Sequence, residues 1–180
     1  MSIHSDQKAV KPKIEDVAGD FLAAERAADI GNLVEFIRAN KIGIRWVSGN
    51  SWALFYKNRQ LGFLKIRYVE CEEMSGKSNP FHKSWVFCHR RDYLERYYSM
   101  EDCELKSFLF DHIYAKNCGY CICGWHLKEK ASLNEQKAGY MNPTECGCYP
   151  LRIYSPTGEA LEFTKRLIEL RMKYILEDSK

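Results

Sequence analysis

The stretch Ile44-Arg-Trp-Val-Ser-Gly-Asn-Ser-Trp-Ala-Leu-Phe-Tyr56 decides the fold of this chain. Residues 44–47 and 52–56 are rich in aromatic and branched apolar side chains, which favour β-strands. The Ser-Gly-Asn-Ser segment between them, 48–51, is typical of a turn. The stretch therefore predicts two strands joined by a short turn, and so an antiparallel pair.

The residues that follow extend this pair into a sheet. A turn at 58–60 leads into a third strand, 61–69, and a polar loop precedes a fourth strand, 84–88. Apolar positions of the third strand alternate with Lys65 and Arg67, so one face is predicted to be buried and the other wet. Because the loops are too short for parallel crossovers, we expect an antiparallel meander of about four strands.

Helical patterns flank these strands in the sequence. The first covers 14–30 and is expected to break at Gly31-Asn32, and a second short helix covers 33–40. A third helix is expected over 99–117, with Ser99 as its cap and Asp102 in its first turn. These patterns place helices before and after the sheet, which predicts an α+β fold.

The last helix is predicted to open at Ser155-Pro156, with the proline in its first turn. Two charged pairs on it, Glu162–Arg166 and Glu169–Lys173, have the i, i+4 spacing of helix ion pairs. Its buried stripe is predicted to consist of Leu161, Leu167, Ile168, Met172 and Ile175.

Length and composition predict a single cytoplasmic domain. The chain has 180 residues, of which 46% are hydrophobic and 28% charged, and its formal net charge is +3. No apolar run is long enough to span a membrane, and the N-terminus lacks the apolar centre of a signal peptide. We expect a disordered leader at 1–12 and one α+β domain at 13–180, with a cysteine-rich loop at 118–148.

Five of the eight cysteines lie in that loop, which predicts a zinc site. Cys118-Gly-Tyr-Cys121 and Cys146-Gly-Cys148 are two short clusters that can turn their thiolates towards one ion. In a reducing compartment clustered thiols favour a metal over disulfides. The spacing of the second cluster, with one residue between its cysteines, departs from the commonest zinc ribbons.

The predicted ligands are Cys118, Cys121, Cys146 and Cys148, with Cys123 as substitute and His89, His112 and His126 as further candidates. Four protein ligands leave no open coordination position, so the zinc would stabilise the fold and would not act on a substrate. The alternatives are a redox pair at Cys118 and Cys121, or a disulfide between the clusters.

Three segments resemble an uncharacterised group of small bacterial proteins. They are 46–52, the helix that runs into Cys118-Gly-Tyr-Cys121, and 160–167. In that group an aromatic-rich sheet, a helix, clustered cysteines and a C-terminal amphipathic helix follow one another in this order. The resemblance implies the same layout here and implies no activity.

The remaining patterns concern partners, and the zinc-binding domain is expected to have a binding or regulatory role. Nucleic-acid binding is one alternative, because basic residues interleave with aromatic ones in and around the strands. The basic residues are Lys57, Arg59, Lys65, Arg67, His89, Arg90 and Arg91, and the aromatic ones are Tyr56, Phe63, Tyr68 and Tyr93. The same alternation is also typical of the solvated face of a half-buried sheet, and Glu70, Glu72 and Glu73 follow it directly.

A small-molecule pocket or a thiol-dependent enzyme is a second alternative. The aromatic residues that would line such a pocket are Trp46, Trp52, Tyr56, Tyr68 and Trp85, although aromatic residues also fill ordinary sheet cores. The sequence predicts no catalytic residue and no oligomeric state.

Overall fold

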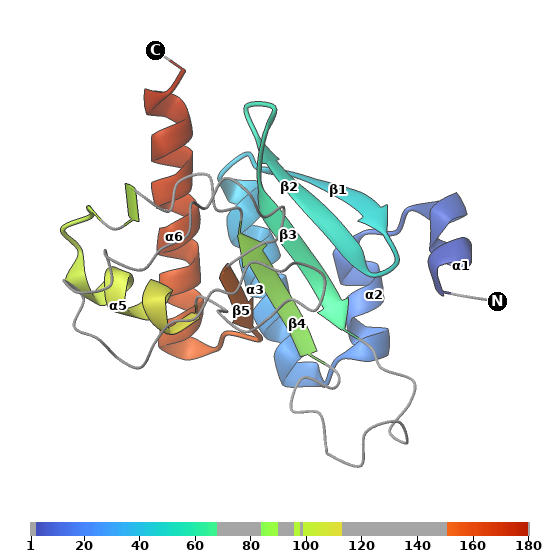
Figure 1. Cartoon of the computed structure of the whole chain (residues 1–180). Coiled ribbons are helices and arrows are strands. Elements are labelled where there is room, and N and C mark those ends of the chain that lie inside the picture. Colours follow the sequence, from blue (N-terminus) through green and yellow to red (C-terminus); the bar gives the residue numbers. More distant parts are fainter. Residues whose placement is uncertain (1–2, 68–83, 90–95, 98, 113–150, 180) are drawn as a thin grey trace, which may run out of the picture.

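The computed structural model describes residues 3–67, 84–89, 96–97, 99–112 and 151–179, which form an α+β fold around one antiparallel sheet (Figure 1). The helices are α1 (Ile3–Val10), α2 (Ile14–Phe21), α3 (Ala24–Ala39), α5 (Cys103–His112) and α6 (Gly158–Glu177). The strands are β1 (Gly43–Ser48), β2 (Ser51–Tyr56), β3 (Arg59–Arg67), β4 (Ser84–His89) and β5 (Leu151–Tyr154).

The sheet confirms the predicted antiparallel meander and adds a strand to it. Its order is β1-β2-β3-β4-β5, and each strand runs antiparallel to its neighbours. The sequence does not predict β5, because Leu-Arg-Ile-Tyr is too short a run for its alternation to stand out. Strand β5 is recognised only by its pairing with β4. This pairing returns the chain to the sheet after the cysteine-rich loop.

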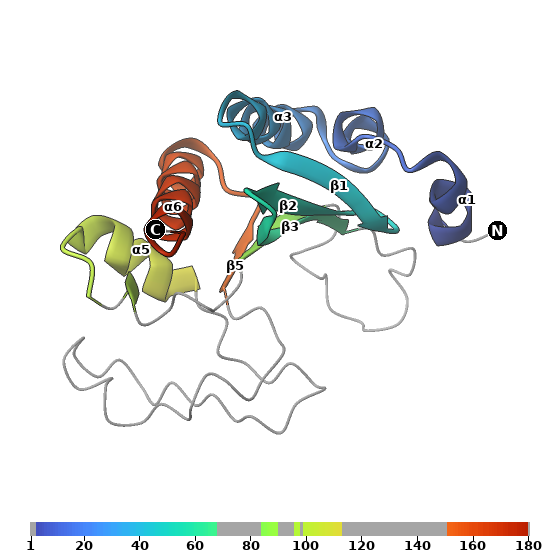
Figure 2. The same ribbon diagram turned by 90° about the horizontal axis from the view of Figure 1, so that it is seen from above.

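One face of the sheet forms the core. Residues directly opposite each other in antiparallel strands share a face, and one such row crosses all five strands. It consists of Trp46, Trp52, Leu64, Phe87 and Ile153. The last four are at most 1% exposed. Helices α2 and α3 lie on one side of the sheet (Figure 2), and α6 packs beside α3 and contacts β3, so the helices cover this apolar row.

The N-terminal helical region breaks earlier than predicted. Leu22 and Ala23 are extended and separate α2 from α3, whereas Gly31 lies inside α3. A glycine costs a helix only about 1 kcal/mol relative to alanine. The buried residues around Gly31, which are Ile30, Leu33, Val34 and Ile37, gain more than this by packing on the sheet, so the prediction of a break at Gly31-Asn32 is wrong.

The starts of α5 and α6 also differ from the prediction. The carboxylate of Asp102 accepts a hydrogen bond from the amide of Leu105 at 3.0 Å and caps α5, whereas Ser99 donates its hydroxyl to the carbonyl of Arg96. Helix α6 begins at Gly158, so Pro156 lies before the helix and is buried.

The predicted buried stripe of α6 is confirmed, but neither predicted ion pair, Glu162–Arg166 or Glu169–Lys173, occurs among the described residues. Leu161, Leu167, Ile168 and Ile175 are buried, and Met172 packs partly against the core. Arg166 pairs with Asp102 at the start of α5, and Glu162 pairs with Lys165 at 2.7 Å. Contacts between α5 and α6 therefore replace the predicted Glu162–Arg166 pair.

Helix α1 occupies residues that the sequence predicts to be a disordered leader. Its Gln7 carboxamide accepts a hydrogen bond from the amide of Asn50 at 2.8 Å and another from the indole of Trp46 at 3.2 Å. It also donates to the side chain of Asn50, which is 4% exposed. Helix α1 carries no apolar stripe for a pattern to reveal, and its order comes from these tertiary hydrogen bonds.

Strands β3 and β4 approach each other closely at Gly62, and this approach leaves no room for a Cβ atom. A Cβ atom at this position would lie 2.4 Å from the carbonyl oxygen of Cys88, which is closer than such atoms pack. We expect Gly62→Ala to lower the free energy of unfolding by about 1–3 kcal/mol, the usual cost of overpacking. Urea denaturation followed by tryptophan fluorescence measures this change.

Gly31→Ala is the matched control. No atom of the described structure lies within 4 Å of a Cβ at Gly31, so this substitution is expected to stabilise the protein by up to about 1 kcal/mol. Equal effects at the two glycines would contradict the strand contact.

Candidate nucleic-acid interface

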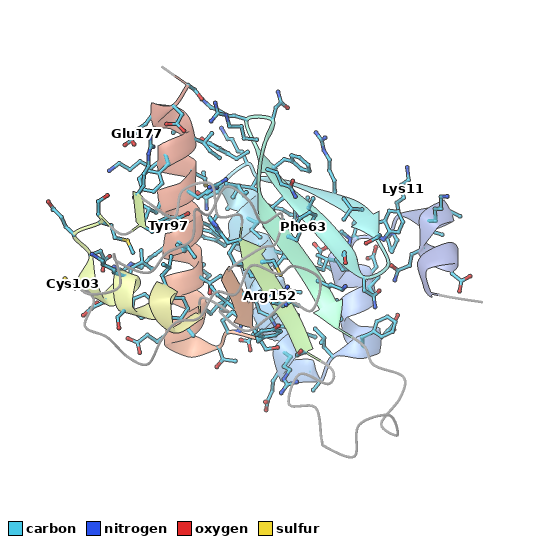
Figure 3. The ribbon with its side chains drawn as sticks, in the orientation of Figure 1. Lys11, Phe63, Tyr97, Cys103, Arg152 and Glu177 are labelled. Carbon is cyan, nitrogen blue, oxygen red and sulfur yellow. The ribbon has the colours of Figure 1, made fainter. Side chains whose placement is uncertain are left out.

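The face of the sheet opposite the helices carries a second row of residues across all five strands. This row consists of Arg45, Ala53, Phe63, Cys88 and Arg152. Figure 3 shows Phe63 on β3 and Arg152 on β5. A shorter row beside it contains Ser51, Lys65, Val86 and Tyr154. We call the face that these two rows define the basic face.

Cations and aromatic rings are neighbours on the basic face. Arg45 and Lys65 are exposed, Arg152, Phe55, Phe63 and Tyr154 are half-buried, and Ser51, Ala53 and Val86 are buried. The guanidinium carbon of Arg45 lies 4.7 Å from the centre of the Phe55 ring, a distance typical of a cation–π contact. The basic face therefore presents positive charge next to flat apolar surfaces.

The five described strands contain no aspartate or glutamate, although the whole chain has 24 acidic residues. Their basic residues other than histidine are Arg45, Arg59, Lys65, Arg67 and Arg152. β-Strands are generally poor in aspartate and glutamate, which accounts for the missing carboxylates. This tendency does not account for the basic residues. The described strands are therefore positive, whereas every described helix except α2 carries both acidic and basic residues.

The structure places only some of the basic and aromatic residues proposed from the sequence on the basic face. Phe63 and Lys65 lie on the basic face. Tyr56 packs against the core, and Arg59 lies at the β2–β3 turn, where it pairs with Asp178 at 3.5 Å. Of Arg67 only the backbone is described, and it pairs with Ser84 on β4. Tyr68, Arg90, Arg91 and Tyr93 lie outside the described residues.

His89 belongs to the core and not to the basic face. Its side chain is 1% exposed, and its Nε2 lies 3.0 Å from the hydroxyl of Tyr97, which is itself fully buried. The sequence offers no partner for His89, because Tyr97 lies eight residues further on, beyond the strand. His89 is therefore a hydrogen-bonded core residue.

His89 is part of a buried polar cluster that joins α6 to the sheet. The rings of Tyr97 and Tyr174 lie 5.8 Å apart, and the guanidinium of Arg96 lies 5.2 Å from the centre of the Tyr174 ring. Burial raises the pKa of Tyr174, the carboxylate of Glu177 raises it further, and Arg96 lowers it. His89 and Tyr97 place their polar groups inside the packed core, which is typical of a structural role.

Tyr97→Phe tests this role. Removing the hydroxyl leaves the buried Nε2 of His89 without that partner, so we expect a loss of about 1–3 kcal/mol in the free energy of unfolding. Tyr56→Phe is the control, because the structure gives the Tyr56 hydroxyl no hydrogen bond among the described residues, and its effect should be within about 0.5 kcal/mol. Thermal and urea denaturation measure both variants, and equal losses would contradict the His89–Tyr97 contact.

The predicted zinc ligands lie outside the described residues. These are Cys118, Cys121, Cys146 and Cys148, together with Cys123 and His126, and of His112 only the backbone is described. Cys88 and Cys103, which are described, are not joined in a disulfide. Within the described part of the chain no three His, Cys, Asp or Glu side chains come together as a metal site. The zinc site stays a prediction from the sequence.

The described aromatic residues that the sequence suggests for a small-molecule pocket pack in or against the core. Trp52 and Trp85 are 1% and 0% exposed, and Trp52 donates its indole N–H to the carbonyl of Pro12 at 2.8 Å. Trp46 and Tyr56 pack partly against the same core, and Tyr68 lies outside the described residues. The described aromatic residues therefore act as core side chains, and the structure supports the interpretation of an ordinary sheet core over that of a small-molecule pocket.

Comparisons with protein-family models, with curated proteins and with solved structures find no match to this chain. The resemblance to small bacterial cysteine-cluster proteins stays a prediction. None of the described helices is both long enough and apolar enough to span a bilayer.

Proposed function

We propose that this protein is a zinc-stabilised domain that binds nucleic acid on the basic face of its sheet. The observation that carries the proposal is that Arg45 and Lys65 are exposed on the same face of strands that contain no carboxylate. Cations neutralise phosphates, and exposed ring surfaces stack on bases. Both groups occur together on the basic face, whereas the helical side of the sheet is covered by the core.

The charge of the face, more than the net charge of the chain, supports this proposal. A net charge of +3 attracts a polyanion weakly, but the five described strands carry cations and no carboxylate, which concentrates positive potential on them. The rival interpretation is a solvated sheet face whose cations serve solubility alone. The two interpretations differ in the affinity for a polyanion and in its dependence on salt.

Replacing Arg45 and Lys65 together by glutamine tests the proposal. If both contact phosphates, the double variant binds a fluorescently labelled 20-nucleotide mixed sequence more weakly, and the slope of log affinity against log salt becomes shallower by about 2. Fluorescence anisotropy at several salt concentrations measures both quantities.

The control replaces two exposed lysines on helices, Lys8 and Lys173, by glutamine, which changes the net charge equally. This control should keep the slope and most of the affinity. Equal losses in the two double variants would show that only net charge matters, and an absence of salt-dependent binding in the natural chain would refute the proposal.

The zinc part of the proposal rests on the cysteine spacing in the sequence. Cys118, Cys121, Cys146 and Cys148 would bind one ion and link the end of the segment after α5 to the segment before β5. A cytoplasmic location belongs to the same proposal, because clustered thiols persist in a reducing compartment.

Native mass spectrometry of protein purified in a reducing buffer, without chelator or metal-affinity tag, tests the zinc site. We expect about one zinc per chain, lost in Cys118→Ser or Cys146→Ser because a structural site needs all four ligands. Cys103→Ser is the control and should keep the metal, since Cys103 is exposed and belongs to no metal site in the described structure. Metal-free protein with all thiols reduced would contradict the site.

A further inference from the structure

We infer that the nucleic-acid site continues from the basic face around the end of the sheet, where Lys41 and Lys57 bind backbone phosphates. The inference rests on the proposed function and adds two residues to its site. Lys41 lies between α3 and β1, and Lys57 lies in the turn between β2 and β3. Both residues are exposed.

The register of the sheet brings these two lysines to the same end. Gly43 on β1 pairs with Phe55 on β2, and Lys41 and Lys57 each lie two residues outside that pair. The turn that carries Lys57 projects from the end of the sheet (Figure 1). We call Lys41 and Lys57 together the basic corner.

The part of the chain around the basic corner is basic throughout. Residues 36–69 contain no aspartate or glutamate. Two of the basic residues in this span are neutralised by carboxylates from elsewhere, because Arg38 pairs with Glu15 and Arg59 pairs with Asp178.

Four other cations of the same span keep their charge uncompensated. Lys41, Arg45, Lys57 and Lys65 are exposed and form no ion pair with a described residue. Uncompensated cations on neighbouring elements attract a polyanion more strongly than the net charge of the chain suggests. The basic corner therefore extends the positive surface that begins with Arg45 and Lys65.

The backbone at both lysines has a conformation that lysine disfavours. The φ angle is 58° at Lys41 and 46° at Lys57, in the left-handed region where a Cβ atom crowds the following carbonyl oxygen. Glycine or asparagine is the usual residue just after a helix end, as at Lys41, and in a two-residue hairpin turn, as at Lys57. Local stability does not account for two lysines here, whereas a requirement for their charge does.

The four cations lie along one path. Lys65 pairs with Ser51, which is six residues from Lys57 on β2, so the two lysines are roughly 20 Å apart. This length corresponds to about six base pairs at 3.4 Å each. The path lies towards the β1 edge of the sheet, because Arg45 on β1 is exposed whereas Ala53 on β2 is buried.

The basic corner offers charge and no open ring. Phe55 is half-buried and lies under the guanidinium of Arg45, and Tyr56 packs against the core. The group recognised at the corner is therefore the phosphodiester backbone, which single strands and duplexes share and which carries no sequence information.

Replacing Lys41 and Lys57 together by glycine in the full-length chain tests the inference. Glycine adopts the left-handed conformation without strain, so the melting temperature should stay the same or rise. The affinity for a labelled 20-nucleotide mixed sequence at 0.1 M salt should fall about tenfold or more, and the slope of log affinity against log salt should become shallower by about 1–2. Circular dichroism and fluorescence anisotropy measure these quantities.

Two double variants serve as controls. Lys41→Arg with Lys57→Arg keeps both charges and should bind like the natural chain. Lys8→Gln with Lys173→Gln removes two exposed charges from helices and should keep the slope. A 20-base-pair duplex and inorganic polyphosphate should lose affinity for the glycine variant as the single strand does, because all three present phosphates.

The outcomes separate the inference from the proposed function. If the glycine variant binds every probe like the natural chain, or loses no more than the helix control, the inference is overturned while binding through Arg45 and Lys65 stands. A lower melting temperature in the glycine variant would assign the lysines a structural role and would also overturn it. If the natural chain binds no probe in a salt-dependent way, the proposed function fails and takes the inference with it.

Discussion

The register of the antiparallel sheet is the constraint on which the rest of the structure depends. The pairing aligns Trp46, Trp52, Leu64, Phe87 and Ile153 on one face. Because side chains alternate along a strand, a slip of one residue would turn this row outwards and bring Lys65 and Phe63 against the helices. Burying a lysine there without a partner would cost several kcal/mol. The same register therefore specifies the core and collects the basic residues on the opposite face.

Two hairpins of the sheet are connected to helices that are remote in the sequence. Gln7 of α1 bonds to Asn50 in the β1–β2 turn, and Asp178 at the end of α6 pairs with Arg59 where β3 begins. Asp178 also accepts a hydrogen bond from Arg96 at 2.6 Å. These contacts tie α1, the end of α6 and the segment at 96–97 to the sheet at its two hairpins.

Sequence patterns reveal the first four strands because these are rich in aromatic and branched apolar residues, and they reveal the apolar stripe of α6 through its helical spacing. They do not reveal α1, which is ordered by the hydrogen bonds of Gln7, or β5, which is four residues long. On the candidate interface, Phe63 and Lys65 follow from alternation within one strand. Arg152 and Tyr154 could not be placed beside them without the pairing of β5.

The burial of His89 could have been predicted from the sequence. Counting in twos from the buried Trp85 and Phe87 places His89 on the core side of its strand, as observed. Tyr97 is different, because its contact with His89 depends on how the chain returns after the strand, and no local pattern specifies that path. The core side of the sheet is thus largely predictable from local alternation, whereas its polar contacts require the tertiary structure.

The claim that the two faces of the sheet have separate roles is tested most directly by photo-cross-linking. An oligonucleotide of ten bromouridines is irradiated with the protein, and the attached peptides are identified by mass spectrometry. Our account predicts cross-links to peptides of the basic face, foremost those that contain the exposed residues Arg45 and Lys65. Cross-links confined to α2, α3 or α6, or none above the background of a non-binding protein, would contradict it.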